Sequence, residues 1–487
     1  MTATLPRPGY SVQSSLAPSL PSPLIRTGRW FVTGFTEKGM LEAQVVGSLT
    51  QFEGLFGKRL SYSILYDALD EFFSDGGVEA IIGRVVGPSA KTGELKLEDS
   101  GAATSLVVKA RGPGEFSKAW KVKVYGTVEK FGLELVEGAT VLEKSPEFTT
   151  QAAAVAWSLN SPYIIVTLGA GVLNPKAQEP TMSEGKDEHG AATDATWKNG
   201  LNLFTKEMGP GQVSHAGRTT AQGYIDQLAH AFANNRFALL DAPNSATAST
   251  LTAASLALRG TNDTYGMMLG RWPVIPGILP NVPREVPPSA VAAALIARSE
   301  ANGNSPNKPA AANNGRSVRA ISLATPPFEE GSLGIEVTRD EMYTKGINLF
   351  TMEGTVVDLY GWRTLTDPAG ALQDWINAGN ARLRMAIVAK AGAIAKNYVL
   401  DEVDGAGIVL HEFEGELKNM LAEYWPNKGL YGKTPEEAFL VNVGPTINTP
   451  ASLANLEMKA EIGLRMSPDA EMVIILISKV PITQQLA

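Results

Sequence analysis

Few residues of this 487-residue sequence could support catalysis or metal binding, because the chain contains no cysteine and only four histidines. Without cysteine there can be no disulfide, thiol nucleophile or thiolate ligand, which is compatible with a reducing cytoplasm. None of the histidines has a paired ligand spacing such as His-Glu-x-x-His. The segment from His411 to Glu414 carries possible ligands, but it is more typical of an exposed loop or helix start. We therefore predict no metal site and no cofactor. The histidines are His189, His215, His230 and His411.

The glycine-rich segments do not form a nucleotide-binding motif. Gly432-Lys433-Thr434 resembles the end of a phosphate-binding loop, but the position that needs the first glycine of that motif holds Asn427, and Pro435 follows at once. Thr434-Pro435 with two glutamates after it is instead typical of a helix start. The turns at 169–171 and 209–211 lack the third glycine of a dinucleotide fingerprint, and no Gly-x-Ser-x-Gly elbow is present. The motifs thus give no support to a nucleotide-dependent enzyme.

Composition and charge narrow the class of protein. A content of 44% apolar and 19% charged residues is typical of soluble globular proteins, and the length suggests about three domains. No apolar run approaches the roughly 18 residues of a membrane span, and the first residues lack the pattern of a signal peptide. A net charge of −8 argues weakly against a general nucleic-acid binder. We expect neither a nucleic-acid partner nor direct membrane insertion.

Strands alternate with helices in two parts of the chain, which predicts a largely parallel sheet. The first part has strands at 30–35 and 80–86, with helices at 48–57 and 61–73 between them. The second part has helices at 221–233 and 248–258, each followed by a strand, at 237–241 and 265–269. Between the two parts, residues 96–148 show short strands of alternating polarity that predict a β-rich module. A helix at 151–159 and a strand at 163–168 follow, and we expect 169–200 to be a long surface loop.

The last third begins with a long helix and ends in short strands. A helix expected over 375–400 has one apolar stripe, and we expect its cations to face outward. Strands are predicted at 439–443, 458–466 and 471–480. The last strand is continuously apolar over 473–477, so both of its faces must be covered, either in its own sheet or in that of a neighbouring subunit. The stripe consists of Ile376, Leu383, Ile387, Ala391 and Ile394, and the cations are Arg382, Arg384 and Lys390.

Residues 1–24 carry five prolines, many serines and few large apolar side chains. Such a segment favours extended conformations and cannot form a core of its own. Two interpretations stay open on composition alone, a disordered tail or an arm that reaches another subunit.

Several segments closely resemble the contractile tail sheath proteins of bacteriophages and R-type pyocins. At the carboxyl end they are TPEEAFLVNVG, the following NTP and the apolar terminal strand. In the middle they are RWPVIPGILP, VPPSAVAAALIARSEANGN, NKPAAANN and GINLFTMEGTVVDLYGWRTLT. Near the amino end, a phenylalanine-rich helix runs into Gly-Gly and a valine-rich strand. The turn at 111–115 resembles the family's Pro-Gly-Glu-Trp segment, with Phe116 in place of the tryptophan.

The resemblance implies a multi-domain α/β (α+β) fold with a subtilisin-like α/β sheath domain. On this reading the chain divides into an amino-terminal arm (1–24), an α/β segment of the sheath core (25–95) and a β-rich module (96–168). The subtilisin-like domain (169–372), a carboxyl-terminal inner domain (373–470) and a terminal arm strand (471–487) follow. A subtilisin-like fold prompts a search for a catalytic triad, for which Asp241, His230 and Ser289 are available. Ser289 instead follows two prolines as a helix opener, so we expect no enzymatic activity.

The resemblance further implies a structural subunit that polymerises helically around an inner tail tube and contracts to drive that tube through the target cell envelope. Its partners would be copies of itself, the tube protein, and baseplate and tail terminator proteins. It would lie in the virion tail after assembly in the host cytoplasm. The alternative is a hydrolase-like enzyme with an α/β domain. The residues expected to join subunits lie in the two arms: Pro8, Tyr10, Val12, Val473, Ile474, Ile475, Leu476 and Ile477.

Overall fold

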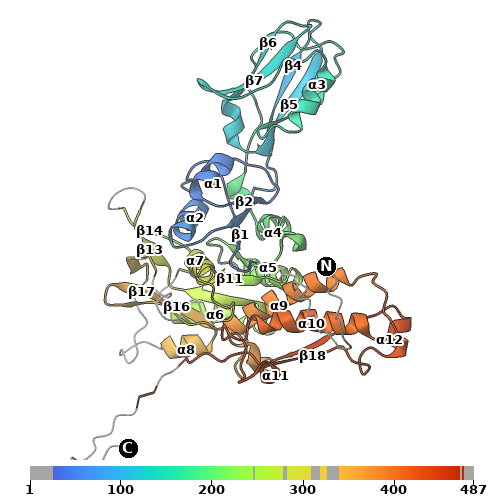
Figure 1. Cartoon of the computed structure of the whole chain (residues 1–487). Helices are drawn as coiled ribbons and strands as arrows, with labels where there is room; N and C mark the ends of the chain where they lie inside the picture. Colours follow the sequence, from blue (N-terminus) through green and yellow to red (C-terminus); the bar gives the residue numbers. More distant parts are fainter. Residues whose placement is uncertain are drawn as a thin grey trace, which may run out of the picture.

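The centre of the chain is an eight-stranded mixed sheet in the order β17-β16-β12-β11-β10-β1-β3-β2 (Figure 1). The computed structural model describes residues 26–244, 247–277, 282–308, 318–325, 339–471 and 474–475. Strands β3, β1, β10, β11, β12 and β16 run parallel, while β2 and β17 are antiparallel edges. The strands are β1 (Trp30–Gly34), β2 (Gln44–Val46), β3 (Ala80–Arg84), β10 (Gln212–His215), β11 (Phe237–Asp241), β12 (Gly266–Gly270), β16 (Ile347–Glu353) and β17 (Val356–Tyr360).

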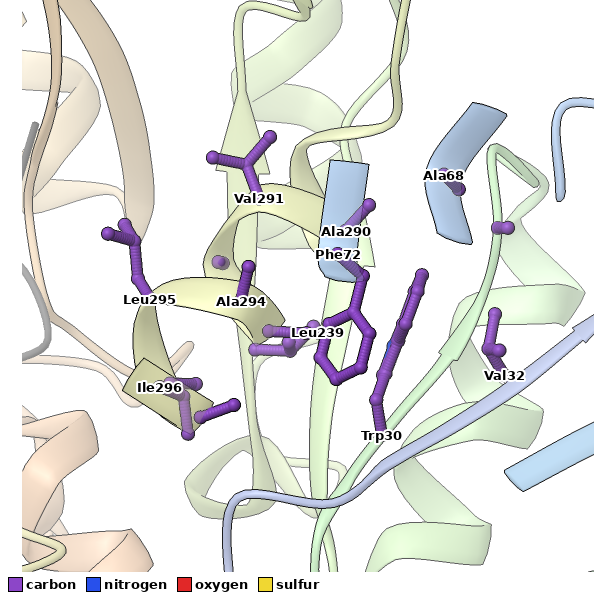
Figure 2. Close-up of a cluster of buried hydrophobic side chains, with 14 of the residues drawn as sticks. Trp30, Val32, Ala68, Phe72, Leu239, Ala290, Val291, Ala294, Leu295 and Ile296 are labelled. Atoms are coloured by element: carbon purple, nitrogen blue, oxygen red, sulfur yellow. The ribbon is translucent and has the colours of Figure 1, made fainter. Parts of the chain in front are cut away.

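Helices cover both faces of this sheet, so the inner strands are apolar on both sides. Over one face, Trp30 and Leu239 pack against α2 (Leu65–Ser74) and α7 (Pro288–Ala301), as Figure 2 shows. The rings of Trp30 and Phe72 lie 5.1 Å apart. Over the other face, Phe31 and Leu240 contact a second cluster. The helices of that face are α4 (Asp194–Asn202), α5 (Ala221–Ala233), α6 (Ala248–Leu256) and α8 (Arg339–Thr344).

The local sequence explains why several of these helices begin and end where they do. The Ser48 hydroxyl accepts a hydrogen bond from Gln51 N–H and caps α1 (Leu49–Phe56), and Gly57 ends that helix at a φ of 86°. Thr220 caps α5 in the same way, through Gly223 N–H. A small three-stranded sheet of β13 (Pro273–Ile275), β14 (Arg284–Glu285) and β15 (Ser322–Leu323) lies in the segment before and after α7.

The β-rich module stands apart from the central sheet, at the top of Figure 1. It has a core of its own, with Trp120, Phe131 and Leu106 buried. Residues 175–186 add single bridges to β4 and β6, and β4 crosses the expected boundary at residue 96. Its sheets are β4 (Thr92–Glu98), β5 (Thr104–Pro113) and β9 (Ile164–Leu168), and β6 (Trp120–Gly126), β7 (Phe131–Glu137) and β8 (Thr140–Lys144), with α3 (Gln151–Ser158).

The chain enters and leaves the module through two adjacent segments. Gly87 N–H donates to Asp187 O at 2.7 Å, and Lys91 and Lys186 exchange backbone hydrogen bonds of 2.8 and 2.9 Å. Below them, the buried Arg84 guanidinium donates to Gly39 O at 2.7 Å. We call residues 85–91 and 186–193 the neck.

The carboxyl-terminal unit packs two long helices against a two-stranded sheet. The helices are α9 (Ala378–Asn397) and α10 (Ile408–Ala422), and β18 (Phe439–Asn442) pairs antiparallel with β19 (Glu461–Leu464). Leu383, Phe413 and Val441 belong to their shared core. Two short helices, α11 (Pro435–Ala438) and α12 (Pro450–Ala454), begin with prolines, the first as the sequence predicts.

Most expected elements are present, and the structure corrects two expectations, the loop over 169–200 and the outward-facing cations of α9, of which Lys390 also has only 13% of its side chain exposed. Part of the segment expected to be a surface loop forms α4, because its Thr193 capping box starts a helix that buries Trp197 and Leu201. Arg382 does not face outward from α9. It is buried, and its guanidinium donates to Pro306 O at 2.9 Å, which supplies the partner that a buried cation requires.

Candidate functional site

Asp241 and Ser289, two of the three residues considered as a triad, are in contact at the carboxyl end of β11. The Ser289 hydroxyl donates to Asp241 Oδ2 at 2.9 Å, and Ser289 N–H donates to Oδ1 at 2.7 Å. Gly217 N–H also donates to the carboxylate, at 3.0 Å. Burial raises the pKa of Asp241 to about 6, although all three donors favour the ionised form. The pair therefore joins β11, α7 and the segment after β10 through buried hydrogen bonds.

The third residue, His230, lies in another environment. Its Nε2 accepts a hydrogen bond from Arg236 at 2.7 Å, and burial, followed by the Arg236 charge, lowers its pKa to about 3. His215 is also buried, with its Nδ1 2.5 Å from Thr33 Oγ1 and a pKa lowered by burial to about 3. Among the described residues, neither imidazole forms a hydrogen bond to Asp241 or Ser289. A serine with a carboxylate and no base at hydrogen-bond distance is not the arrangement of a triad.

The remaining histidines occupy surface or junction positions. His189 stacks on Tyr62 with ring centroids 3.5 Å apart and lies 3.1 Å from Asp187 Oδ1, at the base of the neck. The His411 side chain is 81% exposed. Within the part of the chain that the structure describes, no three His, Asp or Glu residues are grouped to hold a metal ion. None of the helices there is long and apolar enough to cross a membrane.

The sheet of β18 and β19 has a covered face and an open one. Val441 points into the core shared with α10, while Leu440 is 67% exposed and Gly463 is exposed. In the described part of the chain, no further strand pairs with the outer edge of either strand. Unpaired backbone groups beside exposed apolar side chains are the features that accept an added strand.

The segment before the residues expected to form a terminal strand is anchored to the rest of the chain. Of the strand expected over 471–480, the structure describes 471, 474 and 475, and none of these three residues is in a strand. The Arg363 guanidinium holds the Glu471 carboxylate with two nitrogens, through Nε at 3.0 Å, and the Tyr343 hydroxyl donates to the same carboxylate at 3.0 Å. Asn377 also donates to Asp469. The Arg363 hydrogen bond lowers the pKa of Glu471, which keeps this carboxylate ionised. We call this set of contacts the Glu471 anchor.

Beyond the anchor, two of the residues expected to join subunits are described. Ile474 is 73% exposed and Ile475 is 77% exposed, so neither side chain is covered within the described part of the subunit. The other residues of that set lie outside the described residues: Pro8, Tyr10, Val12, Val473, Leu476 and Ile477.

Sequence reasoning missed the Glu471 anchor. Arg363 and Glu471 are 108 positions apart. Arg363 lies in the segment GINLFTMEGTVVDLYGWRTLT and Glu471 begins the strand expected over 471–480, but neither pattern identifies the other residue as its partner.

Comparison with solved structures identifies the fold. The chain is similar to the sheath tail protein Lin1278 from Listeria innocua, with a TM-score of 0.60 and 12% identity over 87% of this chain and 90% of that one. It is also similar to a chain of the contracted sheath complex of PVC, an extracellular contractile injection system (TM-score 0.55, 14% identity, 98% and 99% covered). A chain of the contracted baseplate structure of the anti-feeding prophage gives 0.56, at 17% identity over 98% and 99%.

Comparisons at the level of sequence alone find nothing: no family model matches, and neither does any curated protein. The fold is thus that of contractile sheath proteins.

Proposed function

We propose that this chain is a structural subunit of a contractile sheath, which polymerises helically around an inner tube and contracts to drive that tube through a target cell envelope. The observation that carries the proposal is the fold likeness, which covers 98% of this chain and 99% of a chain from a contracted sheath complex. The Asp241–Ser289 pair without a histidine supports a non-enzymatic role.

The open β18–β19 sheet, the Glu471 anchor and the exposed Ile474 and Ile475 support a mechanism of strand addition between subunits. A strand donated through residues 473–477 would add main-chain hydrogen bonds to an acceptor edge, each worth about 1 kcal/mol net. Each large apolar side chain that becomes fully buried adds roughly 1.5–3 kcal/mol. Ordering about ten residues costs roughly 1–2 kcal/mol each for the backbone. These contributions nearly cancel, so one donated strand binds weakly and a ring of them binds strongly.

Further details extend this proposal. The central domain is the subtilisin-like part of the sheath subunit, and residues 1–24 and 471–487 are the arms that link subunits. Contacts in the arms come from Pro8, Tyr10 and Val12 and from Val473 to Ile477. The partners are further copies, the tube protein, the baseplate and the tail terminator, in a virion tail assembled in the host cytoplasm. The six segments set out from the sequence are the proposed domains.

Negative-stain microscopy of the purified chain tests the proposal. We expect hollow tubes with a helical striation, since a sheath subunit stores its energy in assembly and needs no nucleotide. Discrete globular particles at every concentration and salt tested, together with a measurable esterase or protease rate, would favour the hydrolase alternative.

A further inference from the structure

The turn between α9 and α10, residues 398–407, presents apolar and acidic side chains to solvent. Leu400 is 99% exposed and Val399 is 68% exposed. Leu400 also has a φ of 70°, a left-handed conformation that is uncommon for a leucine. Beside them Asp401 and Glu402 are exposed, and neither forms an ion pair with another described residue. We call residues 398–407 the acidic turn.

The acidic turn is a defined structure. Asp404 accepts backbone hydrogen bonds from Ala406, Ile408 and Val409 at 2.8, 3.1 and 3.0 Å, and these bonds lower its pKa. The carboxylate therefore caps the start of α10 and holds the backbone at the end of the turn. Nearer its start, Asp401 Oδ1 accepts Glu402 N–H at 3.0 Å. An ordered turn that exposes a leucine so fully has the features of a contact site.

A groove of about 1020 Å³ lies at the other end of the same unit. Its cations are Lys308, Lys428, Lys433 and Arg465, and none of them forms an ion pair with a described residue. The aromatic rings of Trp425 and Tyr431 also line it, and Tyr431 is 63% exposed. We call this the basic groove.

The two carboxylates in the wall of the basic groove already have partners. Glu437 accepts Lys433 N–H at 2.9 Å, and Asp469 accepts a hydrogen bond from Asn377. These hydrogen bonds leave the carboxylate charges in place, so four cations against two carboxylates give the groove an excess of positive charge, with apolar rings beside the charges. This chemistry fits a partner that brings carboxylates together with an exposed apolar side chain.

The turn and the groove cannot meet within one molecule. The first turns of α9 pack near the groove, where Arg382 donates to Pro306 O, and the acidic turn follows the last residue of α9. The 20 residues of α9 span about 30 Å. Figure 1 shows α9 and α10 side by side, so the turn and the groove lie at opposite ends of this pair.

We propose that the acidic turn of one copy docks in the basic groove of the next copy. The two terminal segments do not fit the groove as well, because residues 1–24 and 472–487 contain no Asp or Glu side chain. Two different patches at opposite ends of a subunit form a head-to-tail contact, which generates a ring or a helix instead of a closed dimer. The contact rests on the proposed sheath function for its setting, and it would be a second link beside strand addition.

Charge reversal on each side, alone and combined, tests this contact in the full chain. One variant combines Asp401→Lys with Glu402→Lys, and the other combines Lys428→Glu with Lys433→Glu. We expect each variant to need about tenfold more protein than the parent to form tubes at low salt. The fourfold variant should recover assembly, because the charges are again complementary. Glu129→Lys, at an exposed position on the module, is the matched control and should assemble like the parent. Circular dichroism checks that each variant is folded.

Cysteine cross-linking detects the contact whether or not tubes form. Because the chain has no cysteine of its own, any disulfide must come from the introduced residues. Leu400→Cys and Tyr431→Cys subunits are mixed and oxidised, and we expect a heterodimer in preference to either homodimer. If single-side reversals form normal tubes and no heterodimer appears, the contact is refuted and the sheath function stands. If no protein forms tubes yet the heterodimer appears, the sheath function fails and the contact stands. If only the groove-side variant loses assembly and the fourfold variant does not recover it, the groove binds another acidic partner and the proposal is overturned.

Discussion

The central sheet domain and the carboxyl-terminal unit differ in how the edges of their sheets are covered. The central sheet ends in a three-residue strand, β2, on one side and in β17 on the other, where Val318 N–H donates to Val357 O. Both of its faces are buried. The β18–β19 sheet leaves its outer edges without a partner in the described part of the chain, and Leu440 lies exposed on its surface.

The difference indicates which region is complete by itself. The central domain buries charged groups such as Asp241 and Arg271 with hydrogen-bond partners supplied from the same chain. The carboxyl-terminal unit instead exposes leucines, unpaired backbone and free carboxylates that other molecules can cover. We therefore expect substitutions in the central domain to change stability, and substitutions in the carboxyl-terminal unit or the arms to change assembly.

The largest expected effect comes from Ile475→Asp. Because Ile475 is 77% exposed in the subunit, an aspartate there should change the free energy of unfolding by less than about 0.5 kcal/mol. In an acceptor sheet the same charge would be buried, so we expect soluble folded monomers and no tubes. Size-exclusion chromatography with circular dichroism measures both properties. Unfolded or aggregated protein would mean that the strand completes the sheet of its own subunit.

Deletion of residues 1–22 should also abolish tubes and leave a folded protein. The reason is a proline-rich segment that has no local core to lose. Microscopy and thermal unfolding of the truncated chain provide the measurement. Tubes of normal appearance from this protein would rule out the amino-terminal arm as a link between subunits.

Ser289→Ala should lower stability and leave assembly unchanged. The hydroxyl donates to the buried Asp241 carboxylate, so its removal costs about 1–3 kcal/mol, more than the loss of an ordinary helix-start hydroxyl. Urea unfolding measures this change, and Ser249→Ala, at an exposed position on α6, is the control. We expect no esterase or protease activity in either the parent or the variant. A rate that this substitution abolishes would restore the enzyme interpretation.

The smallest expected effect is a change in acid sensitivity. The pKa of His230 is lowered to about 3, so the folded protein holds the neutral imidazole. This contribution to stability is complete above about pH 6.5 and is lost as the pH falls from there toward 3. His230→Gln keeps an acceptor for Arg236 but has no group that titrates in this range. As the pH falls, its free energy of unfolding should therefore decrease by up to about 1.4 kcal/mol per pH unit less than that of the parent. Urea unfolding at pH 7, 6 and 5 tests this, with the exposed His411→Gln as control. Equal pH slopes in parent and His230→Gln would contradict it.

Local signals in the sequence predicted many elements of both regions, but not β10 or α10. The cap at Ser48, the helix start at Thr434-Pro435 and the helix-strand order from Ala221 to Asp241 are all determined by neighbouring residues. Helix α4 was not predicted because the composition of 169–200 is typical of a loop. The signals for the helix were the Thr193 cap and the spacing of Trp197 and Leu201.

Contacts between distant parts of the chain could not be predicted in the same way. Arg382 was expected on the surface because charged residues usually are, and its carbonyl partner lies 76 positions away. Ser289 lies in the first turn of α7 as expected, but the sequence did not indicate that its hydroxyl binds Asp241, which is 48 positions away. The Glu471 anchor depends on Arg363 and Tyr343, which only the fold brings together. Such partners follow from topology, and a single sequence carries no direct record of it.

The neck brings the two ends of the β-rich module together, so the module is a unit that can be removed or exchanged. Its entering and leaving strands are hydrogen-bonded to each other at Lys91 and Lys186, so the module can be cut out and the chain rejoined by a short turn, or another domain with neighbouring termini can replace it. In a polymer, each such graft would be repeated once per subunit at a fixed spacing. A load on the module reaches the rest of the subunit through these two segments and through the residues around Gly112, which lie close to Gly39.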